Sequence, residues 1–208
     1  EGVKIMQIEG KVGAISVESG TVNPLRTTPN GALVTAFDGG KYTEAVLAGR
    51  VFAAANQAAV ALTAAFATTY TGLVIENPVG SGKNIVMLQV SWASTVATPT
   101  ATCIGLMTGA DAGDAAAAVT PRNRFKGSSN SSVAIVDNGC TLSGTPVLEQ
   151  VFTTAWTEAT TAGTLGNPNI AYLDGSLVLG PGYYAAIYSA AANTAAFIFG
   201  FLWEEVDA

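Results

Sequence analysis

The chain contains no histidine, and only two of its 208 residues are cysteines, Cys103 and Cys140. Without histidine, Ser-His-Asp and Cys-His mechanisms are excluded, and the commonest zinc ligand is missing. Two cysteines are too few for a disulfide framework, so we expect both to be buried, reduced thiols. We therefore expect a protein that is not an enzyme and that uses no cofactor and no metal.

Charged residues are scarce as well. They make up 12% of the chain, about half of the usual share, whereas apolar residues make up 49%. Small, uncharged side chains suit a surface that is buried against other subunits, so we expect an oligomer or a larger assembly. The net charge of −6 and the scattered basic residues leave no basic face for phosphates, so we expect no nucleic-acid partner.

Three basic residues do cluster: Arg122, Arg124 and Lys126, within the polar stretch 120–132. As part of a solvated loop they need no function. As a docking contact they would meet an acidic protein surface, because opposite charges steer and orient association. Both interpretations stay open, and the three residues are candidates for an interface.

Neither export nor membrane insertion is expected. Residues 1–10 lack the basic start and apolar run of a signal peptide. Two long stretches, 51–75 and 175–203, carry no charge, but Asn56 and Gln57 interrupt the first and Gly180-Pro181 the second. A span requires about 20 predominantly apolar residues, so neither predicts a membrane helix.

The segment 71–90 looks like a phosphate-binding loop because it contains Gly80-Ser81-Gly82-Lys83. A P-loop requires a glycine five residues before the Gly-Lys pair, a hydroxyl residue after the lysine and a helix behind it. Here Asn77 and Asn84 occupy the first two positions, and the apolar run 85–90 predicts a strand. We therefore expect a turn between two strands and no nucleotide site.

Most of the chain after residue 85 forms short apolar segments that are typical of strands, separated by turns rich in Gly, Pro and Asn. The predicted strands are 85–92, 102–107, 132–136, 147–152, 175–179, 183–189 and 195–203. Asp174-Gly175 and Gly180-Pro181-Gly182 are the strongest turn signals. The pattern predicts an all-β fold, an antiparallel β-sandwich of the jelly-roll kind, over residues 41–208.

Two segments before residue 71 are less regular. Residues 1–40 are punctuated so often by glycine and proline that no long helix fits, and we expect an extended N-terminal arm that lies on a neighbour. Residues 46–70 fit both a helical stripe and a period of two. We prefer strands broken near Asn56-Gln57, because no helix stop precedes the strand before Pro78.

Carboxylates occur in two groups. Asp111 and Asp114 lie in a loop of small residues, which is either a weak calcium site or a solvated loop. Glu204, Glu205 and Asp207 follow the last apolar strand, and we expect them to end it in water and to discourage edge pairing. Because a carboxylate pair can cleave glycosides, a glycosidase stays open as a rival hypothesis.

Large aromatic side chains are the remaining candidates. Trp156, Trp203, Tyr183 and Tyr184 either form a platform for stacking sugars or anchor a core or an interface. Neighbours on a strand point to opposite faces, so one of the two tyrosines is expected to be exposed or at a subunit contact. We take Tyr183, Tyr184 and Trp203 as candidate interface residues.

Two segments, 71–88 and 194–206, resemble virion proteins of tailed bacteriophages, and the resemblance extends over residues 41–206. Among these the chain is most similar to jelly-roll capsid cement, or decoration, proteins. The resemblance implies a homotrimer without catalysis or cofactor that binds the major capsid protein on the outside of a phage head and stabilises adjacent subunits. It also implies assembly in the cytoplasm of the bacterial host and a final location on the virion surface. A phage tail or fibre protein, or a host-surface carbohydrate-binding module, is the alternative.

Overall fold

The computed structural model describes residues 9–11, 22–24, 40–64, 66–95, 102–110, 119–155 and 169–208. The chain divides into two units, Glu1–Ala48 and Gly49–Ala208. In the first unit, β1 (Glu9–Lys11) pairs antiparallel with β2 (Val22–Pro24), and a short helix, α1 (Thr43–Leu47), follows. The rest of the predicted arm lies outside the described residues. Helix α1, the helix of the described segments, has five residues and is too short to cross a membrane.

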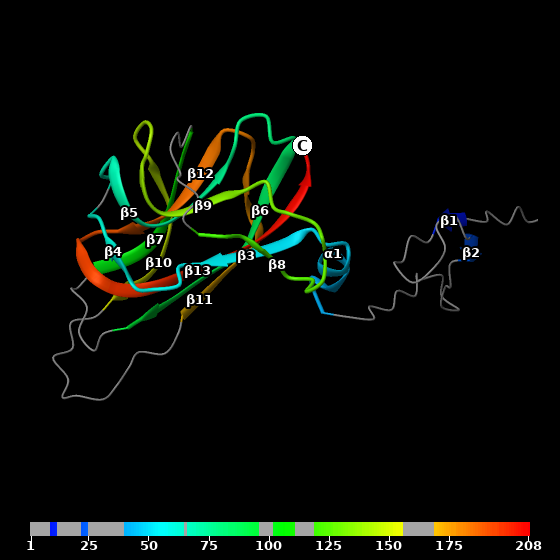
Figure 1. Cartoon of the computed structure of the whole chain (residues 1–208), viewed down its shortest axis with the longest axis horizontal. Coiled ribbons are helices and arrows are strands. Elements are labelled where there is room, and N and C mark those ends of the chain that lie inside the picture. The colour runs from blue at the N-terminus through cyan, green and yellow to red at the C-terminus, as the bar shows by residue number, and fades with distance from the viewer. Residues whose placement is uncertain are drawn as a thin grey trace, which may run out of the picture. The chain divides into compact units, whose positions relative to one another are not determined.

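The second unit consists of antiparallel strands. They are β3 (Val51–Ala55), β4 (Val60–Leu62), β5 (Thr69–Asn77), β6 (Lys83–Ser94), β7 (Thr102–Ala110), β8 (Arg122–Asn123), β9 (Ile135–Thr141), β10 (Val147–Ala155), β11 (Asn169–Leu179), β12 (Tyr183–Ser189) and β13 (Asn193–Asp207). One sheet has the order β10-β7-β12-β5-β9 and the other the order β11-β6-β13-β3-β8, with β4 paired to β13. The two sheets pack face to face (Figure 1), which confirms the predicted β-sandwich.

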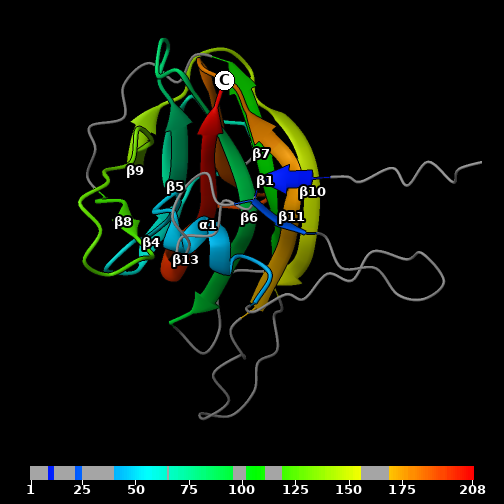
Figure 2. The same ribbon diagram turned by 90° about the vertical axis from the view of Figure 1, so that its right-hand side faces the viewer.

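The strand order is that of a jelly roll. If the eight strands other than β4, β8 and β9 are counted along the chain, one sheet holds them in the order first, eighth, third, sixth. The other holds second, seventh, fourth, fifth, so the two sheets exchange strands as two Greek keys do. Strands β8 and β9, inserted between β7 and β10, each extend one sheet at its edge. Strands β10 and β11 form the opposite edges and lie side by side (Figure 2).

The main core lies between the sheets and is built by alternation along the strands. On β13 the inward side chains are Phe197, Phe199, Phe201 and Trp203, all buried. Phe52 of β3 stacks on Trp203, with 6.2 Å between ring centroids. Because side chains alternate between the two faces of a strand, the residues between these aromatic side chains point to the outer face of the six-stranded sheet.

A second apolar cluster covers the outer face of the five-stranded sheet. Tyr70, Met107 and Tyr184 point outward from their strands, yet they are buried together with Leu142, which follows β9. The Tyr184 ring lies against Gly109, where a Cβ atom would stand within 3 Å of the phenol. Burial raises the pKa of Tyr70 well above its usual value. The outer face of the five-stranded sheet is therefore largely covered around β5, β7 and β12.

The predicted break in residues 46–70 is confirmed, and a side chain explains it. Strand β3 ends at Ala55, and the buried Asn56 takes over the pairing with β13. Its amide accepts the N–H of Phe199 at 2.6 Å and donates to the carbonyl oxygen of Phe197 at 3.3 Å. Asn56 thus imitates a strand backbone where the chain leaves the sheet.

The two strongest turn signals had different outcomes. Gly180-Pro181-Gly182 is a turn, closed by the N–H of Tyr183 on the Gly180 oxygen at 3.2 Å, and it joins β11 to β12. The turn predicted at Asp174-Gly175 is wrong, because both residues lie inside β11 with positive φ angles of 51° and 85°. The pairing register with β6 shifts between Tyr172 and Leu177, where four residues of β11 stand against one of β6, so the pair lies in an irregularity of the strand that uses the same left-handed conformations as a turn.

Candidate interaction surface

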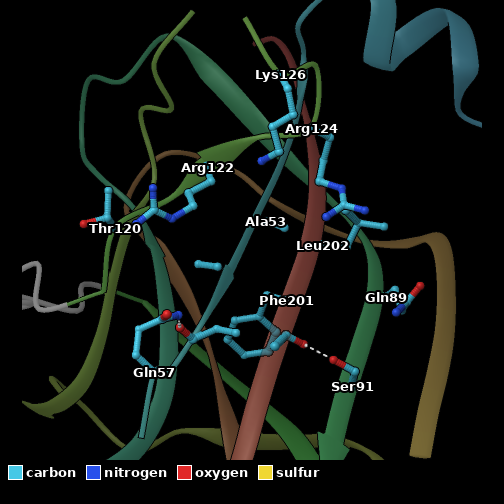
Figure 3. Close-up of a pocket in the computed structure, with 13 residues that line it drawn as sticks. Ala53, Gln57, Gln89, Ser91, Thr120, Arg122, Arg124, Lys126, Phe201 and Leu202 are labelled. Carbon is cyan, nitrogen blue, oxygen red and sulfur yellow. Dashed lines mark hydrogen bonds between the residues drawn. The ribbon is translucent and has the colours of Figure 1, made fainter. Parts of the chain in front are cut away.

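A hollow of about 320 Å³ lies on the outer face of the six-stranded sheet (Figure 3). We call it the trough. Its floor contains Ala53 and Ala55 of β3 and Gly200 and Leu202 of β13, which pair directly across the two strands. A Cβ atom at Gly200 would lie 2.9 Å from Oγ of Ser91 and 3.5 Å from Cβ of Ala55. The trough therefore exists because three of these four outward positions carry only a methyl group or a hydrogen atom.

One wall of the trough is basic. Strand β8 pairs with β3 so that Arg122 stands opposite Ala53, and Arg124 and Lys126 follow at a spacing of two. All three side chains are exposed and line the trough (Figure 3). The sequence cluster is therefore a single wall in space: β8 places Arg122 at the trough, and the bend and turn at 124–127 bring Arg124 and Lys126 to the same hollow.

Hydrogen bonds hold this wall in place. The N–H of Arg124 donates to the Val51 oxygen at 2.8 Å. The Asn123 amide donates to the Gly49 oxygen at 2.8 Å and accepts the N–H of Phe125 at the same distance. The wall is thus attached to β3, and its three cations are presented from an ordered backbone.

The opposite wall is polar and uncharged. It contains Gln89 and Ser91 of β6, and Thr120 and Gln57 complete the lining. No residue that lines the trough is acidic. Within the described part of the chain, Arg122 and Arg124 have no ion-pair partner, whereas Arg50 pairs with Glu204 at 3.0 Å. The trough is therefore a local concentration of positive charge on an acidic protein.

Exposed apolar residues lie on the outermost strands of the two sheets, and those of β11 stand beside the β6 wall of the trough. They lie on the two edge strands, β10 and β11, and we call them the edge strip: Val147, Val151, Ile170, Tyr172 and Val178. Tyr172, which is 66% exposed, stands opposite Gln89, and Ile170 stands opposite Ser91. A smaller hollow of about 160 Å³ separates β10 from β11 and is lined in part by Leu106, Leu173 and Leu177. Sequence reasoning missed the edge strip, because its members stand out only once the strands at the edges are known.

The three aromatic candidates do not lie together. Tyr183 is 52% exposed, as expected for one member of the pair. Tyr184 and Trp203 are fully buried, so their assignment to an interface is wrong. Trp203 points into the main core from a central strand, and Tyr184 belongs to the second apolar cluster.

The expectation for the terminal carboxylates is also wrong for Glu205. Strand β13 lies between β6 and β3 and continues to Asp207, so these residues belong to a central strand. Glu205 is buried and accepts hydrogen bonds from Ser132 Oγ at 2.5 Å, the Val133 N–H at 3.1 Å and the Trp203 indole at 3.2 Å. Ser132 and Val133 were predicted to start a strand, but β9 begins only at Ile135.

The other two terminal carboxylates form ion pairs. Glu204 pairs with Arg50, and Asp207 pairs with Lys83 at 2.5 Å. The hydrogen bond and charge of Lys83 lower the pKa of the exposed Asp207 carboxyl. Glu204 does not discourage pairing at a sheet edge, because β13 pairs there with both β6 and β3, whereas the exposed Asp207 ends the strand beside β6 alone.

The segment that looks like a P-loop is a turn, as expected. Gly80 and Gly82 have positive φ angles, and the Ser81 N–H donates to the Pro78 oxygen at 3.1 Å. The buried Asn77 donates to the carbonyl oxygens of Lys83 and Leu179 at 2.7 and 2.9 Å. Strand β6 follows this turn, so no helix N-terminus faces it.

The described segments contain no group of three or more histidine, cysteine or acidic side chains that would hold a metal ion. Asp111, Asp114 and Trp156 lie outside these segments. Comparison of the chain with family models, with curated proteins and with solved structures found no match. The fold and the surface therefore define the class: a jelly roll with one covered face and one open face that carries a basic trough.

Both cysteines are free thiols, but each is only partly buried rather than fully buried as expected. Cys140 lies on β9, next to the second apolar cluster. Burial, helped by the carboxylates of Asp137 and Glu76, raises the pKa of the Cys140 thiol to about 11.

This raised pKa predicts that the Cys140 thiol reacts slowly with alkylating reagents. In the folded protein at pH 8, we expect Cys140 to react with iodoacetamide at least about tenfold more slowly than in the unfolded chain, because only the thiolate reacts. The rate should rise as the pH approaches 11. A Cys103→Ser variant isolates the signal, which mass spectrometry follows over time. Equal rates in folded and unfolded protein would contradict the prediction.

Proposed function

We propose that the protein is a structural virion protein that binds the outside of a tailed-phage head as a trimer and cements adjacent major capsid subunits. The open face of the six-stranded sheet carries this proposal. It combines an ordered basic wall, a floor of small residues and an apolar border, which together form a surface suited to another protein.

The fold and composition support the same role. Jelly rolls are common in viral capsid proteins, although a fold by itself does not define a function. A cement protein needs one surface for its own copies and another for the capsid. The edge strip and the trough provide two such surfaces, and a closed cyclic trimer would bury the edge strip.

The direct test is to isolate virions of the source phage and to measure whether the protein copurifies with the heads. We expect it on intact heads, accessible to antibody, at a copy number that is a multiple of three, as a trimer requires. Heads that lack it should break at a lower temperature. Labelling confined to tails or fibres would favour the alternative location and contradict the cement role.

One observation favours a carbohydrate-binding module as the second candidate. Tyr172 is well exposed and stands next to the Gln89 amide, the combination of an aromatic face and hydrogen-bonding groups that sugars require. Saturable binding on a glycan array, lost in a Tyr172→Ala variant, would support it. A silent array together with decorated heads would remove it.

Deletion of residues 1–40 tests the role expected for the arm. We expect the second unit to remain folded, because the members of its core cluster all lie within Gly49–Ala208. An arm that adds a strand to a neighbour contributes about 0.5–1.5 kcal/mol per main-chain hydrogen bond. The truncated protein should therefore leave heads at lower heat or denaturant, as sedimentation of treated particles would show. Unchanged binding would mean that the arm is not the clamp and that the basic wall is the better candidate.

A further inference from the structure

The trough has a chemistry that selects its partner. Three of the nine basic residues of the chain stand on one wall of the trough. The rest of the chain therefore has six basic and fifteen acidic residues. No acidic side chain lines the trough to neutralise Arg122, Arg124 or Lys126. Exposed guanidinium groups prefer carboxylate partners, which they bind with two parallel hydrogen bonds. Among the residues that the structure describes, none supplies this missing charge, which leaves the three cations available to an acidic partner.

Polar groups at the trough add a second requirement. Gln89 and Thr120 line it, and within the described residues neither side chain has a hydrogen-bond partner. An amide and a hydroxyl group can bind both main-chain N–H and C=O groups. A helix uses its own main-chain groups internally, whereas an extended segment leaves them free. The lining therefore fits an extended backbone better than a helix.

The size of the trough limits the contact. A volume of 320 Å³ equals that of about ten water molecules at about 30 Å³ each, which is enough for a few side chains. Nucleic acid fits poorly, because three cations on a protein of net charge −6 do not form a basic stripe.

We propose that the trough binds a short, extended, acidic segment of another protein chain, whose carboxylates pair with Arg122, Arg124 and Lys126. The segment lies over the floor formed by β3 and β13, and its main chain meets Gln89 and Thr120. This inference rests on the proposed function, because it names the chemistry of the capsid segment that a cement protein would bind.

Fluorescence anisotropy with a labelled peptide of alternating Glu and Ala tests the proposal on the full chain. We expect saturable binding that weakens at least about tenfold when salt shortens the Debye length from about 10 Å to about 3 Å. The double variant Arg122→Gln/Arg124→Gln should lose at least about tenfold in affinity. The control Arg50→Gln/Lys83→Gln removes the same charge outside the trough and should bind like wild type.

A steric variant separates the trough from charge in general. Ala53→Phe fills the floor without changing charge and should also abolish binding, with folding checked by circular dichroism. If it fails to fold, Gln89→Ala replaces it and should weaken binding while sparing the fold.

Four results would overturn the proposal. They are equal binding by trough and control variants, no binding up to about 1 mM peptide, equal affinity for single-stranded DNA of the same charge, and an oligomer that dissociates in the trough variants. The last would make a second copy the occupant. Head decoration by the trough variants is measured separately: decorated heads without peptide binding refute only this inference, whereas peptide binding without decoration refutes only the cement role.

Discussion

Replacing Trp203 by alanine lowers the free energy of unfolding by about 3–5 kcal/mol, the range for removing a large aromatic side chain from a core. Trp203 has no exposed surface, stacks on Phe52 and donates its indole N–H to Glu205. Because β13 is paired on both sides, it cannot shift to fill the cavity that the alanine would leave. Unfolding in urea, followed by circular dichroism, measures the loss.

Tyr183→Ala is the matched control. Tyr183 is also aromatic and also lies on a jelly-roll strand, but about half of it is exposed. We expect a change within about 0.5 kcal/mol, as for most surface substitutions. If Trp203→Ala left stability intact and instead abolished head binding, Trp203 would be an interface residue and the core described above would be wrong.

Glu205→Leu is the second large effect. The leucine is close in size to glutamate but accepts no hydrogen bond, so the Trp203 indole and the Val133 N–H lose their acceptor in a buried site. Each unsatisfied buried donor costs about 1–3 kcal/mol, which predicts a total loss of about 3 kcal/mol or more. Denaturant unfolding measures it, and the ordering of residues 132–134 should weaken with it.

Two variants of the same strand test the reason for that loss. Glu205→Gln keeps one carbonyl acceptor and should lose about half as much. Glu204→Gln breaks the ion pair with Arg50 but leaves no buried donor, so we expect less than about 1 kcal/mol. Equal losses at positions 204 and 205 would show that charge, rather than buried hydrogen bonding, sets the stability of this strand.

The trough and the edge strip divide the surface in a way that fits a protein made for assembly. The outer face of the five-stranded sheet is covered by the chain's own residues, among them Leu142. The outer face of the six-stranded sheet instead keeps small side chains and guanidinium groups that form no ion pair with any described residue. In a protein with so few charges, leaving one face open is costly unless a partner covers it, and this asymmetry is the physical basis of the proposed function.

The sequence by itself determined the fold class, the broken strand at Asn56 and the turn at Gly80–Gly82, because alternation and turn chemistry act between near neighbours. It also identified Arg122, Arg124 and Lys126 as the cluster of basic residues, because they lie within five positions of one another. The trough opposite them depends on β3 and β13, which are about 150 residues apart in the chain and adjacent in the sheet.

Only the tertiary structure decided what covers each face. Alternation predicts that Tyr183 and Tyr184 point apart, but the burial of Tyr184 depends on Leu142 and the segment after β9. Likewise, the sequence predicts that Glu205 ends the last strand in water. It is buried because β13 is a central strand and because Ser132 and Val133, just before β9, donate hydrogen bonds to it. Asp174 and Gly175 adopt turn-like angles in either context, and the pairing of β11 with β6 on both sides of them places them inside one strand. Such contacts join residues far apart in the chain, and local patterns carry no information about them.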